Sequence, residues 1–245
     1  MKNNYKLFKH GFEIRKIENS KLSLFKKLIH ETKKVVLKKF KKNKNLKLEN
    51  IHESKIDNFN EFRLDVIKKI NKTKNLKINL FKILEADLTE LFGKDIVIQK
   101  FVNFGVQKPN DVERTPMHSD SPSHSLYEVV IWIPLVNCKK TMGLYFFPLN
   151  KTHEAKNLVI NGSNQAIEKF AKKSGINPDV KLGEFVIFLT KCFHYIPVNK
   201  EKTTRWSINV RFKNTFTPYS KKGFLDYYEP ISYSAITERA LNEKK

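Results

Sequence analysis

The hydrophobic pattern of the chain changes its period near Gly93, and this change constrains the fold more than any other feature. Before Gly93, apolar residues recur at helical spacing in three segments, 20–40, 60–70 and 75–93. Apolar residues spaced three or four apart lie on one face of a helix, so these segments are expected to be helices that pack on a core. Ser20 is a candidate N-cap for the first of them, and Gly93 is a stop signal for the last.

After Gly93 the apolar runs become short and rich in β-branched and aromatic residues. Pro, Gly and Asn separate these runs, which is typical of strands joined by turns. One helix, at 164–175, interrupts them. The expected strands are 94–106, 127–136, 143–149, 184–190 and 204–212.

Several consecutive strands favour a sandwich or barrel with helices on its outside. We therefore predict a mainly β protein with flanking α-helices. A helical N-terminal layer, residues 1–93, is expected to pack on a β core, residues 94–245, within one structural domain.

Composition narrows the class of protein. The two cysteines are too few for a disulfide framework. No apolar run resembles a signal peptide, and none is long enough to form a transmembrane helix. We expect a cytoplasmic protein that does not insert into membranes; its oligomeric state has no signature in the sequence.

The formal net charge of +22 would attract polyanions, but 41 of the 47 basic residues are lysine. Lysine, asparagine, isoleucine and phenylalanine are all plentiful, as an AT-rich coding sequence would make them. The charge therefore predicts either a solvated lysine-rich surface or a site for an anionic partner, and both interpretations stay open.

The stretch PMHSDSP places His118 and Asp120 two residues apart between expected strands. Residues two apart on an extended chain point the same way, so this pair could supply two ligands of a metal centre. A site made of two histidines and one carboxylate leaves open positions on the metal. His194, 76 residues after His118 and directly after an expected strand, is the candidate third ligand.

Arginine is scarce, with six residues in the chain, so the placement of Arg205 eleven residues after His194 is informative. Arginine suits a planar carboxylate, and Ser207 on the same strand face could donate to the same group. Arg211 continues that face. A buried arginine needs an anion, which for Arg211 is either a bound carboxylate or a structural Asp or Glu.

The HxD pair, the distant histidine and the arginine eleven residues later together resemble the Fe(II)/2-oxoglutarate-dependent oxygenase superfamily. The stretch from His118 to His153 most resembles its phytanoyl-CoA dioxygenase-like branch, through Trp132, Gly143, Leu144 and Pro148. The likeness covers about residues 95 to 215. A fainter likeness links the chain to oxygenases of carbohydrate-biosynthesis clusters.

This resemblance implies a double-stranded β-helix, the cupin-like jelly roll. By the resemblance, the two histidines and the aspartate bind Fe(II), Arg205 and Ser207 hold 2-oxoglutarate, and Trp132 and Arg211 lie beside this co-substrate. The implied reaction uses O2 and 2-oxoglutarate to hydroxylate a small molecule, with succinate and CO2 as co-products. Substrate identity, and hydroxylation as against desaturation or epimerisation, have no signature in the sequence.

Two alternatives remain beside this hypothesis. The run RWSINVR resembles a strand of the AlkB-like nucleic-acid demethylases, although Ser207 stands where that family has Asn. The other alternative is a cupin-like module that binds metal without turnover, because fold alone does not determine function. Arg205 and Ser207 favour the enzyme, since a metal-binding module has no need of a carboxylate clamp.

Overall fold

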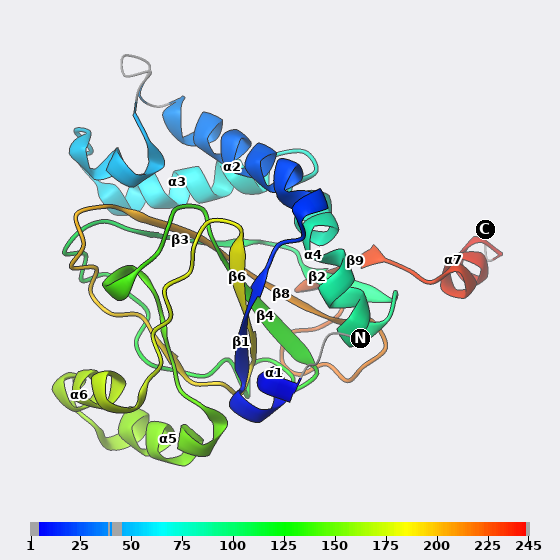
Figure 1. Cartoon of the computed structure of the whole chain (residues 1–245). Coiled ribbons are helices and arrows are strands. Elements are labelled where there is room, and N and C mark those ends of the chain that lie inside the picture. The colour runs from blue at the N-terminus through cyan, green and yellow to red at the C-terminus, as the bar shows by residue number, and fades with distance from the viewer. Residues whose placement is uncertain (1–4, 39, 41–45, 244–245) are drawn as a thin grey trace.

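An antiparallel β-sheet lies at the centre of the computed structural model, which describes residues 5–38, 40 and 46–243 (Figure 1). The α-helices are α1 (Tyr5–His10), α2 (Leu22–Leu37), α3 (Phe59–Asn71), α4 (Leu76–Phe92), α5 (Thr152–Asn161), α6 (Asn164–Ser174) and α7 (Ala235–Asn242). The strands are β1 (Phe12–Lys16), β2 (Ile96–Gln99), β3 (Asn103–Gln107), β4 (Glu128–Pro134), β5 (Tyr145–Phe146), β6 (Glu184–Leu189), β7 (His194–Tyr195), β8 (Arg205–Asn214) and β9 (Tyr228–Ser232).

Strand β8 organises the large sheet. The order is β1-β6-β4-β8-β2-β9, and β3 also pairs with β8. Strand β3 lies along residues 205–209 of β8, while β2 lies along residues 212–214, and every pairing is antiparallel. Strands β5 and β7 form a separate two-stranded sheet. The long β8 strand is therefore shared by three neighbours, which hold its side chains in a defined register.

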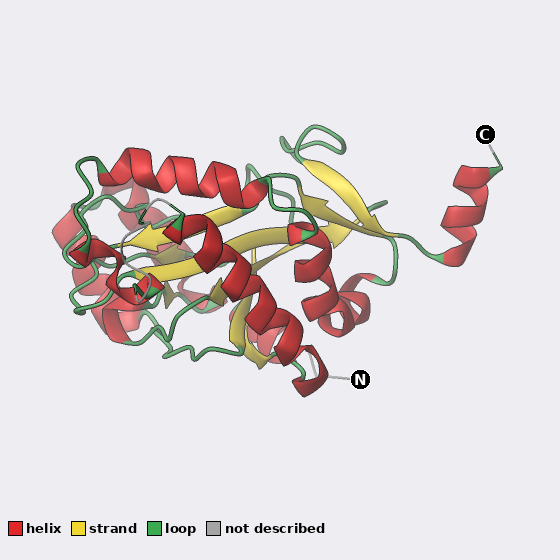
Figure 2. Ribbon diagram, turned by 90° about the horizontal axis from the view of Figure 1, so that it is seen from above, coloured by secondary structure: helices red, strands yellow, loops and turns green. Residues whose placement is uncertain are grey.

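Helices α2, α3 and α4 form a layer over one side of the sheet, and α5 and α6 lie at the opposite end of the view (Figures 1 and 2). Helix α4 buries Leu80, Ile83, Leu84 and Leu88, which confirms the apolar stripe expected there. Each such side chain contributes about 1.5–3 kcal/mol when buried. Gly93 ends α4 with a φ of 72°, a conformation that glycine adopts without strain.

Several elements differ from the sequence-based expectation. Strand β1 lies within the segment expected to be helical, because it pairs along its whole length with β6, a contact distant in sequence. The expected strand 94–106 is divided by a turn into β2 and β3. Ser20 lies inside a short 3-10 turn, and α2 begins two residues later. Helices α5 and α7 were not expected.

These additions change the balance of the fold. The structure confirms an antiparallel sheet with helices around it. Helices nevertheless hold more of the described residues than strands do, so the helical share is larger than the expected "mainly β". Helix α7 buries none of its residues and stands away from the rest of the chain in both views (Figures 1 and 2).

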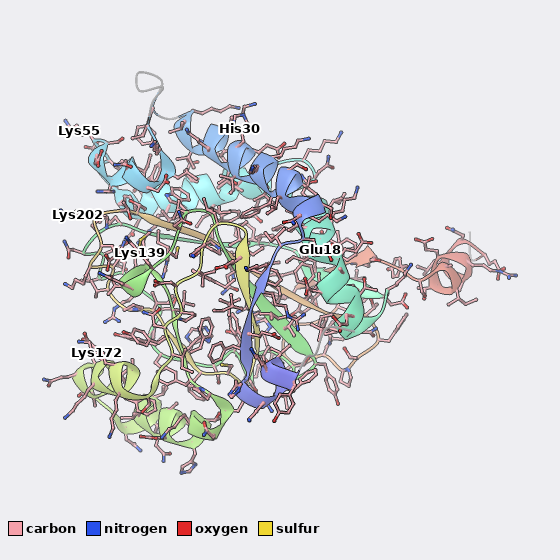
Figure 3. All side chains as sticks on the ribbon, viewed as in Figure 1. Glu18, His30, Lys55, Lys139, Lys172 and Lys202 are labelled. Atoms are coloured by element: carbon pink, nitrogen blue, oxygen red, sulfur yellow. The ribbon has the colours of Figure 1, made fainter. Side chains whose placement is uncertain are left out.

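Lysine side chains populate the periphery of the molecule. The labelled Lys55, Lys172 and Lys202 lie at the outer edge of the view (Figure 3). This placement agrees with a solvated lysine-rich surface. Over the described ranges, every helix is too short or too polar to cross a membrane.

Candidate metal centre and its cavity

Alternate residues of β8 line one cavity of about 470 Å³. Arg205, Ser207, Asn209 and Arg211 all contribute to its wall, together with both histidines of the expected metal site. Side chains two residues apart on a strand lie on the same face of the sheet. The structure therefore places these four side chains on one face, as the sequence pattern predicted for Arg205, Ser207 and Arg211.

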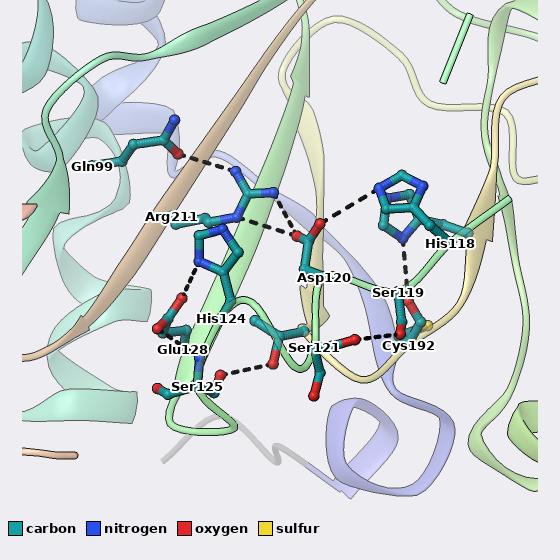
Figure 4. Close-up of polar contacts among 12 residues, drawn as sticks. Gln99, His118, Ser119, Asp120, Ser121, His124, Ser125, Glu128, Cys192 and Arg211 are labelled. Carbon is teal, nitrogen blue, oxygen red and sulfur yellow. Dashed lines mark hydrogen bonds and ion pairs between the residues drawn. The ribbon is translucent and has the colours of Figure 1, made fainter. Parts of the chain in front are cut away.

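Strand pairing brings His118 and His194 together although they are 76 residues apart. The two residues exchange backbone hydrogen bonds of 3.1 and 2.9 Å, and their ring centroids lie 4.2 Å apart. One ligand atom from each of His118, Asp120 and His194 lies within 4.8 Å of the others (Figure 4). The described chain thus contains the His-Asp-His cluster that the HxD motif predicted.

Backbone carbonyls determine which nitrogen of each histidine faces the cluster. Nδ1 of His118 lies 2.8 Å from the Pro116 oxygen, and Nδ1 of His194 lies 3.2 Å from the Cys192 oxygen. A carbonyl oxygen only accepts hydrogen bonds, so Nδ1 carries the proton in each contact. When the ring is neutral, the lone pair then resides on Nε2, which is the arrangement typical of metal-ligating histidines.

Asp120 is held between a histidine and an arginine. Its Oδ2 accepts hydrogen bonds from Nη2 and Nε of Arg211 at 2.6 and 3.2 Å, and its Oδ1 lies 3.5 Å from Nε2 of His118 (Figure 4). Burial alone would raise the pKa of this carboxyl group. The hydrogen bond from His118 and the charge of Arg211 outweigh burial and hold the pKa well below its usual range. Asp120 is therefore an anion at neutral pH.

The two histidines have opposite pKa shifts. Burial, reinforced by the charge of His118, lowers the pKa of His194 to about 4. Burial also disfavours a charge on His118, but its hydrogen bond to Asp120 prevails and raises the pKa. His194 is thus neutral at pH 7 and available as a ligand, whereas a metal at His118 competes with a proton.

Arg205 is a buried cation with an incomplete set of partners. Its side chain is 4% exposed, its Nε has no hydrogen-bond acceptor, and Nη1 reaches only the Met142 oxygen at 3.5 Å. No carboxylate of the described residues forms an ion pair with it. A buried guanidinium in this state is costly unless an anion binds it. Arg205 is therefore suited to hold the carboxylate of a ligand.

Gly105 keeps open the space beside this guanidinium. It lies opposite Ser207 in the β3–β8 pairing. A Cβ atom at Gly105 would lie 2.7 Å from Oγ of Ser207 and 3.7 Å from Nη2 of Arg205. Any larger residue would thus fill the space where Ser207 and Arg205 could meet a carboxylate. The residues present fit a small dicarboxylate that spans from this cradle toward the His-Asp-His cluster.

Arg211 and Trp132 have double roles in the structure. Besides lining the cavity, Arg211 forms the ion pair with Asp120 and donates to Oε1 of Gln99 at 3.2 Å. Of the two anions left open by the sequence, the structure thus provides the structural aspartate. Trp132 is buried and also lines the cavity, so its side chain can pack in the core and still contact a ligand.

Sequence reasoning missed a polar network behind the cluster. Nδ1 of His124 lies 2.8 Å from Oε2 of Glu128 (Figure 4). The same oxygen also accepts a hydrogen bond from the Tyr228 hydroxyl at 2.5 Å. Tyr227 packs edge-on against His124 and contacts Arg211 through its hydroxyl at 3.5 Å. His124 and Glu128 are four residues apart, but Tyr227 and Tyr228 are about 100 residues away in the sequence, so no spacing could reveal their part in the network.

Sequence reasoning also missed the contribution of α3. Leu64, Ile67 and Lys68 of this helix line the cavity, as do Phe101 and Phe104 around the β2–β3 turn. The α3 residues belong to the N-terminal segment, whose sequence resembles no family. Their spacing of three and four residues places them on one helix face, which is the signal that an amphipathic helix leaves in a sequence.

Searches of family models and of curated proteins found no match to this chain. Among solved structures, the chain is similar to the non-heme monooxygenase ThoJ, with a TM-score of 0.61, 11% identity, and coverage of 98% of this chain and 92% of ThoJ. It is also similar to SnoK, a non-heme alpha-ketoglutarate-dependent carbocyclase from nogalamycin biosynthesis, with a TM-score of 0.54, 13% identity, and coverage of 89% and 85%.

A third similar structure is EvdO2 from Micromonospora carbonacea var. aurantiaca complexed with 2-oxoglutarate, with a TM-score of 0.51 and 12% identity. The structural match covers 87% of this chain and 90% of EvdO2. Likeness at this level of identity shows the fold, and it extends over both the helical layer and the sheet. The chain therefore has the fold of the non-haem oxygenases, the superfamily that its sequence resembles.

Proposed function

We propose that this protein is a non-haem Fe(II)- and 2-oxoglutarate-dependent dioxygenase that hydroxylates a small organic molecule. One observation carries the proposal: the two histidines of the His-Asp-His cluster and the incompletely partnered Arg205 line one cavity. A cluster of metal ligands alone would suit a metal-binding module. A buried arginine that lacks an anion, in the same cavity, is the feature that a dicarboxylate co-substrate requires.

His118 and His194, through Nε2, and Asp120, through Oδ1, would hold the iron. Bound iron supplies the site for O2 activation coupled to the oxidation of 2-oxoglutarate to succinate and CO2. The hydrogen bonds to Nδ1 keep both imidazole rings oriented, and Arg211 keeps the carboxylate ionised and pointed at the cluster. Arg205 and Ser207 would anchor the distal carboxylate of 2-oxoglutarate.

The finer features of the fold belong to the same proposal. The large sheet and the β5–β7 pair would form the two walls of a cupin-like jelly roll, with the cluster between them. Residues 1–93 and 94–245 would then make a single structural domain, since their apolar side chains share one core. The phytanoyl-CoA dioxygenase-like motif and a cytoplasmic location remain expectations from the sequence.

Titration of the apo-protein with Fe(II) and 2-oxoglutarate under anaerobic conditions tests the proposal. Chelation of iron by 2-oxoglutarate gives a weak visible charge-transfer band. We expect this band in the wild type, and we expect Arg205→Ala to need about 10- to 100-fold more 2-oxoglutarate, because hydrogen bonds to charged groups contribute about 1.5–3 kcal/mol. Arg239→Ala, on the exposed helix α7, is the matched control and should titrate like the wild type.

The absence of a band in every variant would refute the oxygenase, and a cupin-like metal-binding module would become the better account. A band that appears at the same 2-oxoglutarate concentration in wild type and Arg205→Ala would support the metal centre but refute the role of Arg205. Succinate release in air, measured without added substrate, separates an enzyme from a storage module by an independent readout.

A further inference from the structure

Large apolar side chains lie at the mouth of the cavity. Leu64 on α3 is 59% exposed, and Phe101 in the β2–β3 turn is 48% exposed. Both line the cavity together with the half-buried Ile67. Large apolar side chains gathered at the mouth of a cavity mark a contact surface for a ligand of matching character.

The charged side chains of this cavity have one sign. None of its lining residues is an Asp or Glu, and the lining includes the exposed Lys68. Lys68 follows Leu64 by one helical turn, so both lie on the face of α3 that meets the cavity. Within the described residues Lys68 forms no ion pair.

The neighbouring cations are already engaged by the protein. An adjoining hollow of about 670 Å³ shares Leu64 and Ile67 with the cavity and is also lined by Arg63 and Arg114. Arg63 pairs with Asp111 at 2.9 Å, and Arg114 donates to the Ile196 oxygen at 2.9 Å. Arg205 also lines both hollows, but it is buried and faces the inner cavity. Among the described cations that line these two hollows, Lys68 is the exposed one without an ion-pair partner.

We propose that the substrate is an organic anion with an apolar body, whose carboxylate or similar acidic group is held by Lys68 and whose apolar part rests on Leu64 and Phe101. This inference rests on the proposed function, because it assigns the inner cavity to 2-oxoglutarate and the entrance to the substrate. An acidic group at Lys68 places the apolar body between α3 and the β2–β3 turn. The remainder of the molecule then extends inward to His118, the ligand at the more exposed side of the cluster.

Paired probes test this assignment without any turnover. The affinity of the full chain for 2-naphthoate and for the neutral 2-naphthamide is measured by fluorescence titration, with and without saturating 2-oxoglutarate. We expect the carboxylate to bind about fivefold more tightly than the amide, because a partly exposed charge pair contributes up to about 1 kcal/mol. Lys68→Gln should abolish this preference.

The net charge of +22 attracts any anion, so the control must remove the same charge elsewhere. Lys69→Gln does so on the adjacent position of α3, where the side chain pairs with Asp65 and does not line the cavity. This variant should retain the preference for naphthoate. Leu64→Ser should weaken both probes to a similar degree and leave their ratio unchanged.

Three outcomes would overturn the inference. Equal affinities for the two probes in the wild type would show that the entrance does not recognise an anionic group. If Lys68→Gln and Lys69→Gln reduced the preference for naphthoate equally, only a general effect of net charge would remain. A preference lost in Arg205→Ala but not in Lys68→Gln would place the probe in the inner cavity. None of these results depends on the charge-transfer band, so failure of the inference and failure of the proposed function remain distinguishable.

Discussion

Replacing Arg211 by methionine tests how Asp120, a candidate metal ligand, is held. The change removes two hydrogen bonds to Oδ2 of Asp120, at 2.6 and 3.2 Å, and one to Gln99. Methionine fills a similar volume, so the main effect is electrostatic. The carboxylate would remain buried without its counter-charge.

The size of the expected loss in stability follows from the burial of the Arg211–Asp120 ion pair. The side chains of Arg211 and Asp120 are 9% and 6% exposed. Removing one partner of a buried ion pair costs about 3–5 kcal/mol. Asp120 retains the contact with His118 at 3.5 Å and can accept a proton, and both effects reduce the loss. We therefore expect Arg211→Met to lower the free energy of unfolding by about 3 kcal/mol at pH 7.

Urea unfolding followed by circular dichroism, with EDTA present, measures this loss. The double-mutant cycle with Asp120→Asn isolates the interaction, because the amide carries no charge. In the Asp120→Asn background, Arg211→Met should cost about 1 kcal/mol. A divalent metal should restore more stability to Arg211→Met than to the wild type, since the ion replaces the lost positive charge beside Asp120.

Two results would refute this reasoning. A loss below about 1 kcal/mol for Arg211→Met would show that the ion pair contributes little. The same loss in the presence and absence of the Asp120 carboxylate would attribute the effect to packing alone.

Three further predictions concern other parts of the chain. Gly105→Ala should displace the hydroxyl of Ser207 and weaken 2-oxoglutarate binding in the charge-transfer titration, while the circular dichroism spectrum stays unchanged. Undiminished binding would contradict the proposal that Ser207 and Arg205 hold a carboxylate beside Gly105. Burial lowers the pKa of Lys213 to about 8 despite the charge of Glu128, so its folded pKa lies below its unfolded value of 10.5. The unfolded chain then binds more protons between these values, and wild-type stability relative to Lys213→Met should rise from pH 7 to pH 9.5. Urea midpoints of the two proteins that stay parallel over this range would contradict this. Leu84→Ala, in the fully buried face of α4, should cost about 3 kcal/mol in urea unfolding, and a cost under 1 kcal/mol would show that the helical layer is loosely packed.

Local sequence determined the elements whose patterns are periodic. Helices α2, α3 and α4 follow from apolar residues at helical spacing, and α4 ends at Gly93 as expected. The common face of Arg205 and Ser207 follows from the two-residue period of a strand. Strand β1 could not be foreseen in this way, because its five residues become a strand only through pairing with β6. The division of 94–106 likewise depends on how β2 and β3 each pair with a part of β8.

The candidate ligands were identifiable from the sequence by type and spacing, but their partners were decided by tertiary structure. His118, Asp120 and His194 stand in a recognisable motif, whereas the pairing of Asp120 with Arg211 depends on which strand faces the HxD loop. Gly105 and Lys68 carry no motif at all. Their proposed roles depend on the pairing of β3 with β8 and on the position of α3 along the cavity wall. Residue spacing encodes which side chains share a face, while the long-range packing of those faces determines what each side chain meets.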